Sequence, residues 1–122
     1  MTAIMLLPLI SGSFEASSNG DWRETIRFLT EEGNPLDLSG ISFRSDVREE
    51  AGSANRKLTL STDNGFLIAG GADGTLSWAV PSLRMEQLGG TYVTDLVAEA
   101  DGVVRNLCPR PLVLTVRRGV TR

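Results

Sequence analysis

The chain has 122 residues, 41% of them hydrophobic, and a formal net charge of −3. This length fits one domain whose core needs no disulfide or metal for stability, and the single Cys108 has no internal partner. The absence of histidine excludes the usual zinc, copper and haem ligand sets and every Ser-His or Cys-His catalytic pair. We therefore expect a compact protein that is not an enzyme and binds no cofactor or metal.

The cations are almost all arginine, and Lys57 is the single lysine. Arginine suits planar, bidentate contacts at protein interfaces, although a GC-rich genome explains the same bias. The acidic balance argues against nucleic-acid binding. Three arginines gather near the C-terminus, which is too few for a groove that follows phosphates; we assign them to a protein interface: Arg117, Arg118 and Arg122.

An apolar run occupies residues 3–10. It is too short to cross a bilayer, and the first ten residues lack the Lys or Arg of a signal peptide, so we expect no membrane contact. Pro8 interrupts a helix here. Residues 1–19 are predicted as an extended N-terminal arm or a first strand, and residues 20–122 as the β-sandwich domain. The apolar side chains predicted to lie at an interface are Ile4, Leu6, Leu7 and Leu9.

Alternation of polar and apolar residues predicts a strand over 22–30, where Ile26 and Phe28 alternate with charged and hydroxyl side chains. Turns follow at residues 33–35 and 39–40, and a second alternating strand covers 41–48. A polar loop spans 49–55. The remaining predicted strands or short apolar stretches are 56–61, 66–69, 75–80, 91–100, 103–108 and 112–116.

One helix is predicted, over Pro81 to Leu88, with Gly89 as its C-terminal cap. Asp101-Gly102 predicts a two-residue hairpin, and Pro109 and Pro111 are expected to interrupt strand pairing. Short strands with turn signals every 8–12 residues predict an all-β, antiparallel sandwich.

Several side chains are of types that occur in catalytic or ligand-binding sites, but their positions in the sequence favour structural roles. The carboxylates Glu31, Glu32, Asp37, Asp46, Glu49 and Glu50 fall in turns or on solvent-facing positions. The stretches 63–65 and 70–74 lack the full calcium pattern and the phosphate-binding lysine, so they are predicted as turns. Cys108 is expected to be buried and inert. The aromatics expected in the core or at its rim are Trp22, Trp78 and Tyr92.

The order of several short motifs resembles a family of small β-sandwich proteins of tailed bacteriophages, including the N-terminal domain of baseplate upper proteins. The motifs that carry this resemblance span residues 20–122: Gly20-Asp21-Trp22, Glu32-Gly33-Asn34-Pro35-Leu36-Asp37-Leu38-Ser39-Gly40, Phe43-Arg44, Val47-Arg48, Gly74-Thr75-Leu76, Gly90-Thr91-Tyr92-Val93-Thr94-Asp95-Leu96, Val116 and Val120-Thr121-Arg122.

The resemblance implies an immunoglobulin-like sandwich that serves as a building block of the virion and carries no catalytic residues. Its expected partners are other virion proteins and further copies of itself, in particles assembled in the bacterial host cytoplasm. The tail, baseplate, neck or fibre attachment is the expected location, and capsid decoration is the alternative. A carbohydrate-binding sandwich or a protease inhibitor remains a rival. Baseplate upper proteins continue into a longer region, so an adaptor role here is expected to use the sandwich surface and the arm.

The arm hypothesis makes a direct prediction. Deletion of residues 2–10 is expected to weaken incorporation into particles while the domain stays folded.

Overall fold

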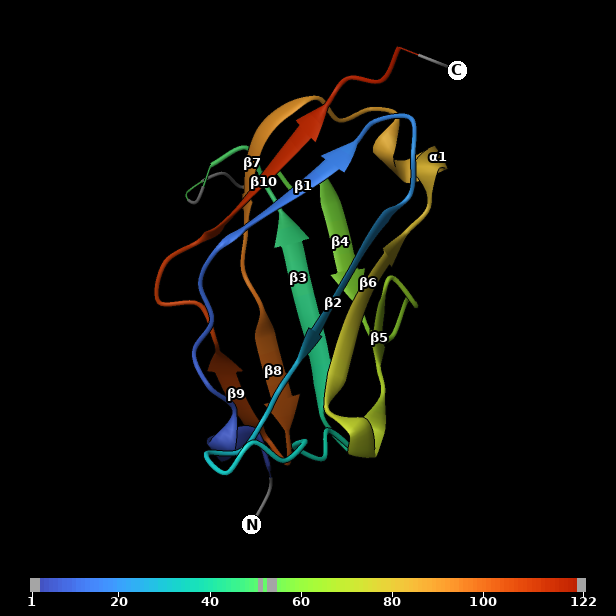
Figure 1. Ribbon diagram of the computed structural model, residues 1–122. Coiled ribbons are helices and arrows are strands. Elements are labelled where there is room, and N and C mark those ends of the chain that lie inside the picture. The colour runs from blue at the N-terminus through green and yellow to red at the C-terminus, as the bar shows by residue number, and fades with distance from the viewer. Residues whose placement is uncertain (1–2, 51, 53–54, 121–122) are drawn as a thin grey trace.

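The computed structural model describes residues 3–50, 52 and 55–120, and this part of the chain forms an all-β sandwich (Figure 1). Its strands are β1 (Ser13–Ser17), β2 (Trp22–Arg27), β3 (Ser42–Val47), β4 (Leu58–Ser61), β5 (Leu67–Ala69), β6 (Thr75–Val80), β7 (Gly90–Thr94), β8 (Val97–Ala100), β9 (Val103–Asn106) and β10 (Leu112–Arg117). The helical elements are η1 (Ala3–Leu6), η2 (Gly71–Asp73) and α1 (Ser82–Met85). The predicted all-β class and the single short α-helix are confirmed.

The strands form two layers. One layer has the order β2-β6-β5. The other combines β1-β10-β7 with β4-β3-β8-β9, because β7 runs into β8 and a backbone pair between Arg48 and Val93 joins β3 to β7. Alternation of the chain between these layers is the immunoglobulin-like arrangement. One pairing departs from the expected antiparallel sheets, since β1 runs parallel to β10.

The predicted strand over 91–100 is divided between β7 and β8, and the last strand shows why. Thr94 in β7 pairs with Leu112 in β10, whereas Val97 in β8 pairs with Asn106 in β9. The segment between Asn106 and Leu112 therefore has three more residues than the segment between Thr94 and Val97 that lies opposite it. The surplus falls at residues 107–111, which contain Pro109 and Pro111. Proline has no N–H for the ladder, so the strand bulges there, as predicted.

The predicted hairpin at residues 101–102 joins β8 to β9, and both residues have positive φ, 52° and 77°. These angles match the type I′ turn that fits the twist of two antiparallel strands. Asp101 is the single non-glycine residue with positive φ in the described part of the chain. Asp-Gly is one of the few residue pairs that adopt this turn readily.

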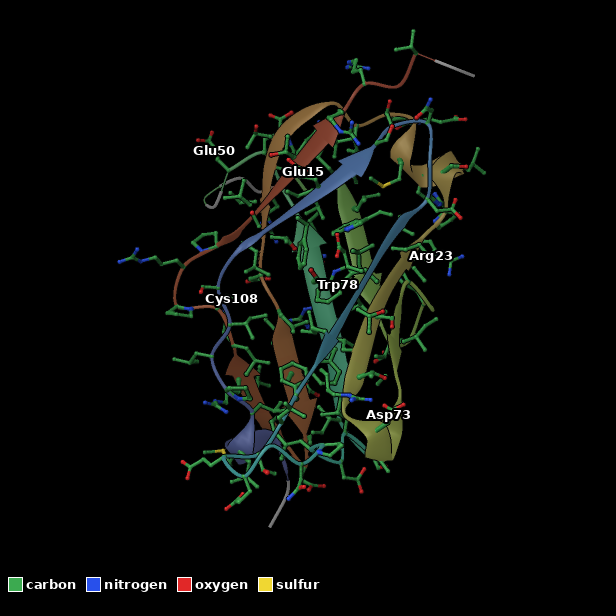
Figure 2. All side chains as sticks on the ribbon, in the orientation of Figure 1. Glu15, Arg23, Glu50, Asp73, Trp78 and Cys108 are labelled. Atoms are coloured by element: carbon green, nitrogen blue, oxygen red, sulfur yellow. The ribbon has the colours of Figure 1, made fainter. Side chains whose placement is uncertain are left out.

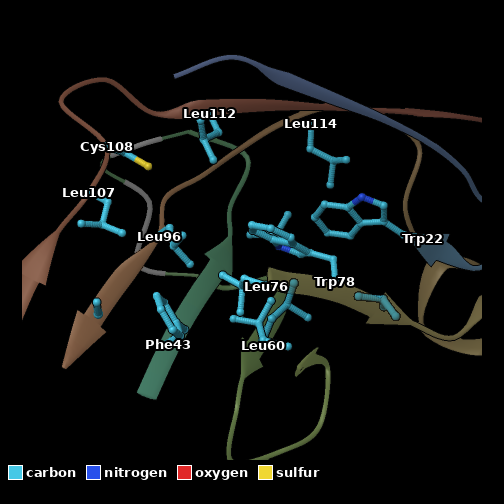
Figure 3. Close-up of a cluster of buried hydrophobic side chains, with 14 of the residues drawn as sticks. Trp22, Phe43, Leu60, Leu76, Trp78, Leu96, Leu107, Cys108, Leu112 and Leu114 are labelled. Carbon is cyan, nitrogen blue, oxygen red and sulfur yellow. The ribbon is translucent and has the colours of Figure 1, made fainter. Parts of the chain in front are cut away.

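Aromatic side chains fill the core between the layers (Figure 3). Trp22 and Trp78 are both 1% exposed, and Phe14 from β1 packs against them with ring centroids 5.8 and 5.1 Å away. Each such buried side chain contributes about 1.5–3 kcal/mol by leaving water. Because Tyr92 is also buried, the three aromatics singled out in the sequence belong to the core.

Several residues of the short motifs named in the sequence analysis stabilise the fold. The Tyr92 hydroxyl bonds the Gly89 N–H (2.9 Å) and carbonyl (3.2 Å), a tyrosine corner of the immunoglobulin type. A Cβ at Gly74 would lie 2.7 Å from the Phe28 carbonyl oxygen, so this position requires glycine. Asp21 accepts a hydrogen bond from the Ser82 amide (2.8 Å), which ties the start of β2 to α1.

Candidate functional site

The apolar N-terminal segment is fastened to the sandwich. Ile4 and Leu7 are 0% and 1% exposed and belong to the hydrophobic core. The Arg105 guanidinium, on β9, donates hydrogen bonds to the Ile4 carbonyl (3.0 Å) and to the Leu7 carbonyl. Further along, the Ile10 amide donates to the Leu107 carbonyl (2.8 Å). Residues 3–10 therefore pack on their own domain, and the first strand, which was the alternative to an arm within residues 1–19, is β1 (Ser13–Ser17).

The same segment turns a second set of apolar side chains outward. Met5, Leu6 and Leu9 are 58%, 56% and 58% exposed. One turn of 3-10 helix explains the division, because Ile4 and Leu7 are three residues apart and so share one face. We call the three exposed residues the N-terminal patch. Exposed apolar clusters of this kind commonly mark protein contacts.

The predicted interface residues do not form one surface. Ile4 and Leu7 lie in the core, contrary to the prediction that they lie at an interface. Leu6 and Leu9 lie at the surface, where an interface would need them. Arg117, the last residue of β10, and Arg118 are exposed, and Figure 1 shows that β10 ends at the end of the molecule opposite the N-terminal segment. Arg122 lies outside the described residues. The fold therefore separates the exposed N-terminal residues, Leu6 and Leu9, from Arg117 and Arg118.

A second surface feature, which the sequence analysis did not single out, is a hollow of about 530 Å³ on the outer side of the larger layer. The Asp46 carboxylate stands between the guanidinium groups of Arg48 (3.7 Å) and Arg56 (3.5 Å), and Arg44 and Asp95 also line the hollow. The alternation of Arg44, Asp46 and Arg48 on one strand face was a visible signal, but strand pairing was needed to bring Arg56 beside them.

The clearly shifted pKa values in the described residues belong to two turn carboxylates and to the cysteine. Hydrogen bonds from Ser39 and Thr75 lower the pKa values of Asp37 and Asp73, which keeps both turn carboxylates charged. Burial raises the pKa of the Cys108 thiol, as expected for an inert cysteine. The described residues contain no group of three or more His, Cys, Asp or Glu side chains that could hold a metal ion. They also include no helix long and apolar enough to cross a membrane.

The fold defines the chain as an immunoglobulin-like β-sandwich, and comparisons with known proteins add little to that class. No known protein family and no curated protein matches the sequence. Among solved structures, the chain is similar to a variant of an endo-fucoidan hydrolase from glycoside hydrolase family 107, with 11% identity and a TM-score of 0.37. The match covers 93% of this chain and 13% of the hydrolase chain. A likeness this distant identifies neither a family nor an activity.

Proposed function

We propose that the protein is a structural component of a tailed-bacteriophage particle, in the tail, baseplate, neck or fibre attachment, and that it acts by binding other particle proteins and further copies of itself. The proposal joins the order of the phage-like motifs to one structural observation: the N-terminal patch is exposed while its own segment is fastened to the core by Ile4, Leu7 and Arg105. Particle assembly would then take place in the host cytoplasm.

A fastened apolar patch suits assembly for an energetic reason. Binding loses free energy when a loose segment has to be ordered, and a segment already held by its own domain avoids most of that loss. Figure 1 shows η1 beside the β8–β9 hairpin, where Val103 and Val104 are 39% and 59% exposed. The patch therefore adjoins further exposed apolar residues. A capsid-decorating protein would use the same contact chemistry and is the alternative location.

The carbohydrate-binding rival loses support from the aromatic side chains. A carbohydrate-binding sandwich would use aromatic rings exposed at its surface. Five of the seven aromatics are 6% exposed or less, and Phe14 and Phe66 are partly buried against the core. The ring of Phe66 is also near the Arg84 guanidinium, 5.9 Å from the ring centroid. No aromatic side chain in the described residues is therefore fully exposed.

The test replaces the patch by serine, as Met5→Ser, Leu6→Ser and Leu9→Ser together, and measures the protein by quantitative mass spectrometry in purified particles. Loss of three exposed apolar contacts is expected to reduce occupancy at least about tenfold, since 1.4 kcal/mol corresponds to a factor of ten. The matched control is Ile68→Ser with Leu83→Ser, which removes exposed apolar side chains elsewhere (53% and 71% exposed). Both variants should melt close to the wild-type temperature.

Two outcomes would contradict the proposal at different levels. Absence of the wild-type protein from purified particles would reject the virion role. Full occupancy of the serine variant would reject the N-terminal patch as the contact surface.

A further inference from the structure

The strand β2 has one hydrogen-bonded neighbour, β6, and its other edge is uncovered. The Phe28 amide donates to the Gly74 carbonyl (2.8 Å), and the register pairs Trp22 with Val80 through Arg27 with Thr75. In an antiparallel ladder alternate residues bond to the same side, so the backbone groups of Arg23, Thr25 and Arg27 face away from β6.

The opposite edge of β6 supports this assignment. The Ala79 amide donates to the Phe66 carbonyl (2.9 Å), and the Gly70 amide donates to the Thr75 carbonyl (2.8 Å). Thr75 and Ala79 therefore bond toward the β5 side, which leaves the alternate residues of β6 for β2. No backbone hydrogen bond among the described residues reaches Arg23, Thr25 or Arg27 from the uncovered side.

An apolar crevice of about 380 Å³ runs along this edge. It separates the C-terminal half of β2 from residues 8–14, because the N-terminal strand crosses over to pair with β10. Apolar side chains from both sides line it, among them Leu9, Ile10, Phe14, Ile26, Phe28 and Leu112. Unpaired backbone groups beside an apolar crevice are the two elements that an added strand requires.

The charges beside the edge select the kind of strand. Arg23 and Arg27 are exposed and share the outer face of β2 with Thr25, and Figure 2 shows Arg23 at the surface, away from the buried Trp78. Arg23 makes a long 3.7 Å ion pair with the exposed Asp21, and Arg27 makes no ion pair within 4.0 Å among the described residues. Both guanidinium groups are therefore accessible to an acidic partner.

The same arginines disfavour a second copy of this chain. Antiparallel pairing of two β2 strands centred on Thr25 would place Arg23 of each copy opposite Arg27 of the other, and like charges directly opposite each other destabilise a sheet. Charged side chains on an edge strand are a recognised protection against self-pairing. A strand with acidic side chains on that face would be attracted instead.

We propose that the β2 edge binds an extended acidic segment of a different protein by strand addition. Acidic side chains of that segment lie beside Arg23 and Arg27, and the alternate apolar side chains enter the crevice at Ile26 and Phe28. This surface shares Leu9 with the N-terminal patch, but the β2 edge and its two arginines lie outside the patch. The inference therefore goes beyond assembly through the patch, and either proposal can fail while the other holds.

The probe is a blocked peptide of about seven alternating glutamate and valine residues, long enough to pair with the six residues of β2. In NMR titrations with labelled protein we expect shifts concentrated at residues 22–28 and 8–14, and slower hydrogen exchange of the Arg23, Thr25 and Arg27 amides. A lysine–valine peptide of the same length should bind at least about tenfold more weakly. Methylation of alternate peptide nitrogens in the acidic probe should abolish binding, because it removes the hydrogen bonds to the edge.

Variants of the protein give the matched controls. Arg23→Glu with Arg27→Glu should reverse the preference between the two peptides, whereas Arg110→Glu, in the 107–111 bulge, should leave it unchanged. Thr25→Pro should weaken binding of the acidic peptide because it removes the central edge N–H. A variant with Met5→Ser and Leu6→Ser, which leaves the crevice residue Leu9 in place, should still bind the acidic peptide, and this separates the inference from the proposed function.

Three results would overturn the inference. Equal affinity for the acidic and basic peptides would remove the role of the arginines. Unchanged binding to the double glutamate variant would do the same. Shifts confined to the hollow around Arg44 and Arg48 would show that acidic peptides bind at another place.

Discussion

The edges of β10 and β2 both lie beside the N-terminal part of the chain, but only the edge of β10 is covered. β1 pairs with β10 in parallel from Ser13–Val113 to Ser17–Arg117, and the Ser18 amide continues the ladder to the Arg117 carbonyl (2.9 Å). β2 has no such neighbour among the described residues. β1 therefore covers the edge of β10, whereas the edge of β2 carries exposed arginines, which disfavour self-pairing.

Proline substitutions should separate the two edges with the largest effect. Thr115→Pro removes a ladder hydrogen bond from β10, which has β1 on one side and β7 on the other, and should destabilise the protein by about 3 kcal/mol or more. Thr25→Pro removes an outward N–H and a hydroxyl contact with Ser77 (2.9 Å), and should cost about 1 kcal/mol. Urea unfolding measures both. Equal losses would show that the β2 edge is paired in solution.

Truncation of leucines should show which part of the N-terminal segment belongs to the core. Leu7→Ala removes a side chain that is 1% exposed and should cost about 3 kcal/mol. Leu9→Ala changes a side chain that is 58% exposed and should stay within about 0.5 kcal/mol. Deletion of residues 2–10 should therefore unfold or strongly destabilise the domain, contrary to the expectation from sequence. A folded deletion variant with wild-type stability would contradict the conclusion that residues 3–10 contribute to the core.

Arg105 should stabilise the attachment of residues 3–10 to the sandwich through its hydrogen bonds to two of their carbonyls. Arg105→Met keeps much of the side-chain length but leaves the Ile4 and Leu7 carbonyls without their donor, at a cost of about 2 kcal/mol. Arg110→Met is the control, because Arg110 is exposed in the 107–111 bulge and makes no described ion pair. Thermal unfolding compares them. Identical melting temperatures would mean that the apolar contacts alone fasten the segment.

The smallest effect is expected at the acidic turn near the end of the β2 edge. Hydrogen bonds from the Thr75 hydroxyl (2.7 Å) and amide (2.9 Å) lower the pKa of Asp73, with a smaller contribution from Arg27. A folded-state pKa below the unfolded value of 3.8 stabilises the protein above that pH, and this stabilisation is lost as the pH falls through the folded value. Asp73→Asn should flatten the loss of stability below about pH 4, and Thr75→Val should flatten it less. An unchanged acid profile would exclude this carboxylate as a contributor.

Local patterns predicted most of the strands because alternation is visible in a single segment. β2, β3 and β6 follow the expected alternation, and the Asp101-Gly102 hairpin and the proline bulge lie where their backbone chemistry demands. β1 was not resolved from the apolar run before it, because Ser13–Ser17 offers only Phe14 and Ala16 as apolar positions. Its parallel pairing with β10 joins residues about 100 positions apart, which no local pattern reports.

For the candidate surfaces, too, the sequence indicated the residues, and the fold decided which of them are exposed. Apolar composition drew attention to residues 3–10, but the position of Arg105 and of the core decided that Ile4 and Leu7 are buried while Leu6 and Leu9 remain outside. The alternation of Arg23, Thr25 and Arg27 was evident in the chain, but its meaning depended on which edge β1 covers.

By itself, the sequence determined an all-β sandwich without histidine chemistry, because composition and period-two alternation are properties of single segments. Only the tertiary structure decided which edges are closed and which apolar side chains reach the surface. Those outcomes depend on hydrogen bonds and packing between segments that are distant in the chain. A strand can pair with one neighbouring strand on each of its two sides, and the sequence of a single strand does not show which neighbour that is.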